Sequence, residues 1–155
     1  MSIETRIEEL GLELPSPPSA VAVYRPAMTV GDLVYTSGHL PVLPDGSLLT
    51  GCLGRDVDEE FGYRAARQAG LAMLATLRQH LGSLDRVGGV IKLLGMVAST
   101  PEFTAQPAVI NGCSELMRDV FGAEQGVGTR SAVGVAALPL GVAVEIEGIF
   151  QLRSN

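Results

Sequence analysis

Two amphipathic helical segments alternate with long apolar segments of strand character, and this order is what most constrains the fold. The longer helical segment spans about residues 56–81, and its apolar side chains recur at three- and four-residue steps. The second spans about residues 106–121, with Pro107 in its first turn. Strand-like segments fall at 21–30, 33–37, 87–97, 131–138 and 142–152. Helices interleaved with strands predict an α+β fold with both long helices on one face of a sheet.

Local signals mark the ends of these segments. Gly31-Asp32 fits a two-residue hairpin turn of type II′, and residues 139–141 separate the last two strands, which we interpret as a second hairpin. A short helix that begins after Ser2 and ends at Gly11, together with a proline-rich linker, forms an N-terminal extension over residues 1–16. The chain has 155 residues, a length that predicts a single domain over 1–155.

The apolar content exceeds what two helices can cover. Hydrophobic residues make up 46% of the chain and charged residues 18%, and the chain has 19 glycines where an average chain of this length has about 11. Small alanine side chains on the longer helix allow it to lie close to the sheet. The second face of the sheet is also apolar and must be covered by something that the sequence does not contain. Burial between subunits is one answer.

Charge and hydropathy exclude several classes of protein. The 17 acidic against 11 basic residues give a net charge of −6, which disfavours nucleic acid as a partner. The longest apolar run, residues 132–144, contains Pro139 and is shorter than the roughly 20 residues that cross a bilayer. The charged N-terminus does not resemble a signal peptide, so we expect a cytoplasmic protein.

Cysteines and histidines give no metal-binding pattern. Cys52 and Cys113 are widely separated, and we favour two buried small hydrophobic residues over a disulfide. His39 and His80 lack the spacing of metal ligands, so no metal site is expected. His80 is expected at a helix end, partly exposed. Lys92 interrupts an apolar strand and needs either a charged partner or an exit to solvent.

The end of the chain carries an arginine and two glutamates that could form an anion site. Arg130 precedes an apolar strand, and period-two geometry puts Glu145 and Glu147 on one face of the next. An arginine fork matches a carboxylate, and a glutamate within reach could hold or protonate a water. A structural Arg–Glu pair or a solvated acidic face explains the same pattern. A tight turn at 139–140 would oppose residue 145 to about residue 134, so contact with Arg130 would need a bulge, a diagonal reach or a shared cavity.

Other polar residues stand at informative positions. Tyr24 is expected in the first strand, and Ser37 and Gly38 at the end of the second, where a hydroxyl and a free backbone N–H would be exposed. Asn111 lies near the apolar face of the second helix. Each of them alone fits a capping or packing role as well as a ligand-binding one.

Two long stretches resemble a known family. Tyr24 with Gly31–Pro41 (GDLVYTSGHLP) resembles the N-terminal signature of the Rid family of reactive intermediate deaminases, also called YjgF-like proteins. Residues Thr129–Glu147 are similar to its C-terminal signature, and the match runs from about Pro17 to Leu152. The resemblance implies a chorismate-mutase-like α+β fold that assembles as a homotrimer. The three sheets would pack inward as a barrel, with clefts between the subunits.

The resemblance also implies an activity and a site. The family's archetype hydrolyses enamines and imines of the 2-aminoacrylate type to 2-oxo acids and ammonia, without a cofactor. The family's carboxylate-binding arginine falls on Arg130 and its water-handling glutamate on Glu145. Its further ligand residues fall on Tyr24, Ser37, Gly38 and Asn111. Ala132 stands where many members carry a cysteine, so a role of the backbone N–H would survive and a role of the thiol would not.

Departures from the pattern leave alternatives open. Residues 106–113 and the N-terminal extension are typical of a divergent branch of the family, for which the substrate is not identified by the motif. The same arginine could serve a protein that binds or senses a small carboxylate, such as a 2-oxo acid, without catalysis. An endoribonuclease or translation-inhibitor activity, attributed to some members, is disfavoured by the acidic charge and the lack of a basic or aromatic patch.

Overall fold

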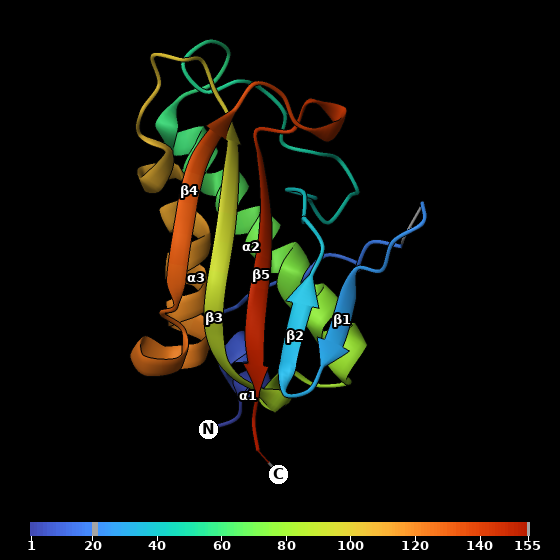
Figure 1. The fold of residues 1–155 in the computed structure, drawn as a ribbon. Helices are drawn as coiled ribbons and strands as arrows, with labels where there is room; N and C mark the ends of the chain where they lie inside the picture. Colours follow the sequence, from blue (N-terminus) through green and yellow to red (C-terminus); the bar gives the residue numbers. More distant parts are fainter. Residues whose placement is uncertain (20–21, 155) are drawn as a thin grey trace.

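A computed structural model describes residues 1–19 and 22–154. Its helices are α1 (Ile3–Glu9), α2 (Glu59–Leu81) and α3 (Gln106–Gln125), with short 3₁₀ turns η1 (Leu84–Arg86) and η2 (Pro139–Gly141). Its strands are β1 (Ala27–Val30), β2 (Leu33–Thr36), β3 (Val87–Ala98), β4 (Thr129–Val135) and β5 (Val144–Leu152). They form one mixed five-stranded sheet in the order β1-β2-β5-β3-β4. Figure 1 shows α2 and α3 side by side behind one face of this sheet, which confirms the predicted α+β fold.

The helix ends follow local capping chemistry. The Asp58 carboxylate accepts a hydrogen bond from the Phe61 N–H, and the helix ends at Gly82, which has a φ of 83°. The predicted start near residue 56 is three residues early, because the Asp56 carboxylate accepts from the Cys52 N–H in the preceding turn. Helix α3 breaks at Gly122, where φ is 88°, as the sequence predicted, and then makes one more turn.

The first hairpin is confirmed, but its first strand is shorter than predicted. Val30 faces Leu33 across the Gly31-Asp32 turn, and Gly31 has a φ of 62°. Strand β1 covers only Ala27–Val30, so Tyr24 lies in the loop before it and not in the strand. Residue 21 of the predicted strand lies outside the described residues.

The predicted second hairpin is wrong. Strand β4 pairs with β3 in parallel, and β5 pairs with β3 on its other side in the antiparallel sense. The chain therefore passes from β4 to β5 over the end of β3, through η2 (Figure 1). The physical reason is the α3 crossover between β3 and β4, which makes these strands parallel neighbours and leaves β5 only the opposite edge of β3.

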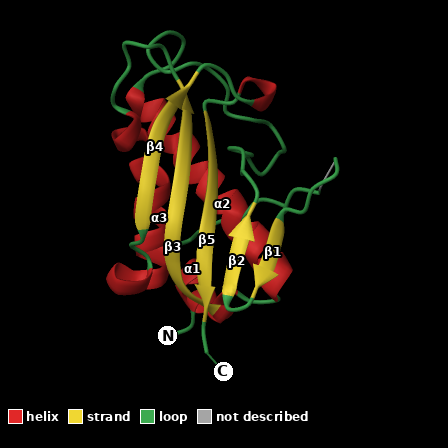
Figure 2. Ribbon diagram, viewed as in Figure 1, coloured by secondary structure: helices red, strands yellow, loops and turns green. Residues whose placement is uncertain are grey.

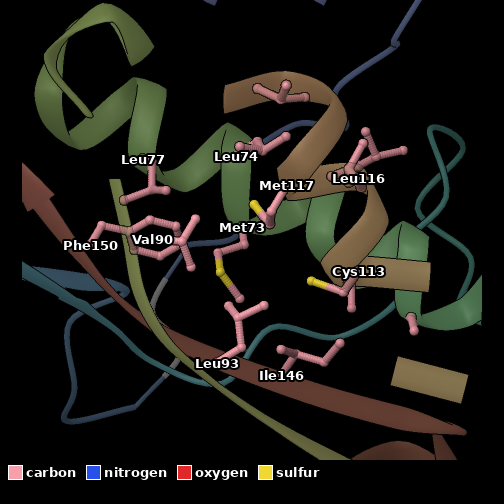
Figure 3. Packing of buried hydrophobic residues seen from close by; sticks show 14 of the residues in the cluster. Met73, Leu74, Leu77, Val90, Leu93, Cys113, Leu116, Met117, Ile146 and Phe150 are labelled. Atoms are coloured by element: carbon pink, nitrogen blue, oxygen red, sulfur yellow. The ribbon is translucent and has the colours of Figure 1, made fainter. Parts of the chain in front are cut away.

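The core lies between the helices and the sheet. Figure 3 shows Met73 and Leu77 of α2 and Met117 of α3 packed against side chains of the sheet, among them Leu93 and Phe150. The cysteines are free; Cys113 is buried in this core and Cys52 is half-buried. Burial raises the pKa of the Cys113 thiol to about 12, so it behaves as the small hydrophobic residue that the sequence predicted.

The second face of the sheet is uncovered in the described chain and faces the viewer in Figure 2. It presents Met28, Val30, Tyr35 and Val133, which are between 43% and 57% exposed. Lys92 is exposed to solvent on this face. Of the two predicted possibilities, a charged partner or an exit to solvent, the structure shows the second. The apolar second face inferred from composition is therefore present.

The N-terminal helix docks on the rest of the fold. The Ser2 hydroxyl accepts a hydrogen bond from the Thr5 N–H, and Ile3 and Ile7 are buried. The Glu4 carboxylate bonds Arg78 at 2.7 Å and accepts from the Leu84 N–H at 2.9 Å. In the described part of the chain, no helix has both the length and the apolar content to span a membrane.

Candidate functional site

Arg130 lies on β4, at the edge of the sheet, and its side chain reaches over the helix-covered side to α3. Its Nη1 donates to Asn111 Oδ1 at 2.8 Å and to Ser114 Oγ at 3.1 Å. Within residues 1–19 and 22–154, Arg130 forms no salt bridge, and its Nε and Nη2 donate to no acceptor. The structural Arg–Glu pair that the sequence left open is therefore not present. The guanidinium is held on one side and available on the other.

A cavity of about 290 Å³ opens beside this guanidinium. Asn111, Ser114 and Arg118 of α3 line one wall, and the loop before β4 lines the other. Asn111 and Ser114 are three residues apart and so share one face of the helix. Asn111 was found from the sequence and Ser114 was missed, although its spacing from Asn111 was a usable signal.

Ala132 follows Arg130 on the same side of β4. It faces Gly95 in the register with β3 and packs against the core. Strand β4 pairs on one side only, so its outer side presents backbone groups that the sheet leaves unpaired. The structure thus brings together Arg130, Asn111, Ser114 and Ala132, which we call the arginine group.

Glu145 lies on the other face of the sheet. In β5 the side chain of Ile146 is buried, whereas Glu145 and Glu147 share the uncovered face, as the period-two pattern predicted. Partial burial, and to a lesser extent the charge of Glu147, raises the pKa of the Glu145 carboxyl above its usual value. A glutamate of this kind is suited to exchange protons closer to neutral pH.

The segment after β2 lies against Glu145. A Cβ placed on Gly38 would stand 2.5 Å from Glu145 Oε1, so only a glycine leaves the carboxylate its present position. The Ser37 hydroxyl donates to the Arg25 carbonyl at 2.5 Å, which ties this segment to the loop that carries Tyr24. Tyr24 itself is 46% exposed. We call Ser37, Gly38 and Glu145 the glutamate group.

The two groups do not meet within one chain. Arg130 is level with Gly148 across β3, three residues from Glu145 along β5. Two strand spacings and three residues each correspond to about 10 Å, and the two side chains also leave the sheet on opposite faces. None of the three routes considered from the sequence, a bulge, a diagonal reach or a cavity within the chain, joins Arg130 to Glu145.

The chain is similar over most of its length to a family model, to curated proteins and to solved structures. Residues 4–146 match a family model described as "YjgF/chorismate_mutase-like, putative endoribonuclease". Protein TCP17 of Trypanosoma cruzi is 38% identical over 152 residues, which cover 98% of this chain and 95% of that protein. The crystal structure of Atu1372 from Agrobacterium tumefaciens superimposes with a TM-score of 0.88 and 44% identity, covering 97% and 94% of the two chains.

One relative also has a ligand in its structure. The Escherichia coli protein named "Putative reactive intermediate deaminase TdcF" is 30% identical over 139 residues, which cover 89% of this chain and 93% of that protein. Its crystal structure with bound serine gives a TM-score of 0.61 and 28% identity, covering 92% and 97% of the two chains. With the family model matching most of its length, this chain belongs to the YjgF-like family of reactive intermediate deaminases.

Proposed function

We propose that the protein hydrolyses small 2-imino or enamine carboxylates to 2-oxo acids and ammonia in the cytoplasm. The observation that carries the proposal is the guanidinium of Arg130. It is oriented by two neutral side chains, leaves two donors free, and has no carboxylate partner among the described residues. A planar fork with free donors is a receptor for a carboxylate. The relative solved with bound serine, which carries a carboxylate, supports this reading.

A second copy of the chain would complete the site. The arginine group and the glutamate group lie on opposite faces of one sheet, so one chain cannot surround a small substrate with both. The uncovered face is apolar, and its burial against other copies would stabilise an assembly. We propose a homotrimer in which each cleft combines the arginine group of one subunit with the glutamate group of its neighbour.

The chemistry then needs orientation more than activation. The substrate carboxylate would bind Arg130 Nε and Nη2, which holds the electrophilic C=N carbon at a fixed place. A water held by the neighbour's glutamate group adds its oxygen to that carbon. Its proton passes through the carboxylate of Glu145 to the nitrogen. Collapse of the resulting carbinolamine, in which the hydroxyl proton passes to the nitrogen, releases ammonia, and the hydroxyl oxygen becomes the carbonyl of the 2-oxo acid.

Backbone donors would assist this sequence. The N–H of Gly38 has no acceptor among the described residues, and the Cα of Gly38 lies beside Glu145. In the cleft this N–H would stabilise charge that develops during addition. Ala132 brings no thiol to the cleft, so the proposed steps use none.

The test is ammonia release from a 2-imino acid, generated in the assay by a pyridoxal-phosphate-dependent dehydratase. Arg130→Ala should abolish the acceleration while the sedimentation coefficient stays that of the wild-type assembly. Arg55→Ala is the matched control, because Arg55 is exposed and pairs with Asp56 away from both groups. Unchanged turnover in Arg130→Ala refutes the proposal.

Two other outcomes would point to other functions. Binding of a 2-oxo acid that depends on Arg130, without any rate acceleration, would indicate a carboxylate-binding or sensing protein. RNA cleavage that survives Arg130→Ala and repurification would support the endoribonuclease activity named in the family description. The net charge of −6 opposes that activity.

A further inference from the structure

His39 is a buried histidine with both ring nitrogens hydrogen-bonded. It is 2% exposed. Its Nδ1 lies 2.8 Å from the Ser37 carbonyl oxygen, and its Nε2 lies 2.7 Å from Thr76 Oγ1 in the C-terminal third of α2. Its own backbone N–H and carbonyl both bond Ile146 of β5. The ring therefore connects the segment that carries the glutamate group to the helix layer behind the sheet.

The partners of the ring decide which nitrogen carries the proton. A carbonyl oxygen can only accept, so Nδ1 must be the donor to Ser37. Burial lowers the pKa of His39, and the bond to Ser37 offsets this only in part, so the ring is neutral near neutral pH. Nε2 then has a free lone pair, and the Thr76 hydroxyl donates to it.

This bond sets the orientation of the next peptide. In a trans peptide the N–H points opposite to the carbonyl of the preceding residue. Because the Ser37 carbonyl is directed at the buried ring, the Gly38 N–H is directed away from the core. The Ser37 N–H is also bound, to the Pro26 carbonyl at 2.9 Å. The Gly38 N–H has no acceptor among the residues that the structure describes, and the Cα of Gly38 lies beside the Glu145 side chain.

We propose that His39, supported by Thr76, is a positioning residue that locks the Ser37–Gly38 peptide with the Gly38 N–H toward the reacting atoms. The inference rests on the proposed function for its kinetic consequence. The orientation of the Ser37–Gly38 peptide plane, which His39 fixes, does not depend on catalysis. Without the bond from Nδ1, the half-buried Ser37 carbonyl would lose its hydrogen-bond donor. Rotation of the peptide would relieve this and would turn a carbonyl oxygen, instead of a donor, away from the core.

Two substitutions of His39 distinguish the contribution of Nδ1 from that of Nε2, because each keeps only one of the two hydrogen bonds of the ring. In His39→Asn the side-chain amide nitrogen occupies the place of Nδ1 and can still donate to the Ser37 carbonyl. In His39→Gln the amide oxygen can take the place of Nε2 and accept from the Thr76 hydroxyl, whereas the bond to the Ser37 carbonyl is lost. Thr76→Val and Thr76→Ser form a second pair, in which only the serine variant keeps the hydroxyl.

The kinetic expectation is a loss in kcat without a matching rise in KM. Removing one preorganised donor to a developing charge costs roughly 10²–10³-fold in kcat. His39→Gln should lose about that much, with KM within a few-fold of wild type because Arg130 still binds the carboxylate. His39→Asn should recover most of the loss. Thr76→Val should fall between them, and Thr76→Ser should resemble wild type.

Amide NMR with pyruvate as the probe keeps the inference testable if the wild type releases no ammonia. The Gly38 amide resonance should move on pyruvate addition in wild type and His39→Asn, and stay in place in His39→Gln. That result without ammonia release would refute the deaminase and retain the positioning role. A wild-type kcat in His39→Gln, equal losses in both His39 variants that track their stabilities, or a Gly38 amide that ignores pyruvate in wild type would overturn the inference.

Discussion

Replacing Gly38 with alanine perturbs the glutamate group by one methyl. Gly38 does not have a positive φ, so alanine is compatible with its backbone. The new Cβ would stand 2.5 Å from Glu145 Oε1, whereas ordinary contacts begin at 3.4 Å. The carboxylate must therefore retreat by about 0.9 Å, the difference between these distances. A misplacement near 1 Å costs about 10²-fold in rate, so we expect kcat/KM for imine hydrolysis to fall about 100-fold.

The fold should tolerate the same change. The obstacle is the Glu145 side chain from Cγ outward and no backbone atom, so the side chain can turn aside and the free energy of unfolding should fall by only about 1 kcal/mol, at the low end of overpacking costs. Gly89→Ala is the matched control, because its Cβ would lie at an ordinary 3.4 Å from the Gln125 carbonyl oxygen. Ammonia release gives kcat/KM, and urea unfolding gives stability; the control should be near wild type in activity.

Two results would refute this reasoning. Wild-type turnover in Gly38→Ala would mean that the position of the Glu145 carboxylate does not matter to the reaction. A double-mutant cycle tests the contact itself: in a Glu145→Ala background, the stability cost of Gly38→Ala should vanish. A cost that persists there would place the strain elsewhere.

Three further predictions concern the packing, the charge and the N-terminal extension. Gly112→Ala should cost more than about 3 kcal/mol in urea unfolding, because its Cβ would meet the backbone carbonyl of Tyr63; Gly70→Ala, which meets only movable side chains, should cost about half as much. The raised pKa of Glu145 adds stability below the unfolded-state pKa that is lost as pH rises through the folded-state value, so Glu145→Gln should gain stability relative to wild type between about pH 4 and pH 7. A stability difference between Glu145→Gln and wild type that stays the same across this pH range would contradict the prediction. Glu4→Ala removes a partly exposed ion pair and an N–H acceptor, and should cost about 1 kcal/mol in thermal unfolding with turnover unchanged.

Much of the local structure was predictable because its causes are local. Apolar spacing identified both long helices, and Ser2, Gly82 and Gly122 mark helix ends through capping and left-handed backbone. The alternation of side chains along a strand predicted that Glu145 and Glu147 share one face. The motif resemblance identified Arg130 and its helix partner Asn111, which the structure joins at 2.8 Å.

The errors came from contacts between distant parts of the chain. The last two strands follow one another after a short turn, which favours a hairpin from the sequence, yet β3 lies between them. The strand-like character of residues 21–30 predicts Tyr24 in a strand, but only Ala27–Val30 find partners in β2. Strand pairing depends on which edges remain free after the helices have packed, and no local pattern contains that information.

By itself, the sequence determined the α+β class, the two long helices, the apolar excess of the sheet and the residue types that can hold a carboxylate. It could do so because periodicity, capping and side-chain chemistry are properties of neighbouring residues. Only the tertiary structure decided that Arg130 and Glu145 leave the sheet on opposite faces, and that the Gly38 N–H points away from a buried His39. These depend on the α3 crossover and on a ring held between a loop and a helix, which join residues far apart in the chain.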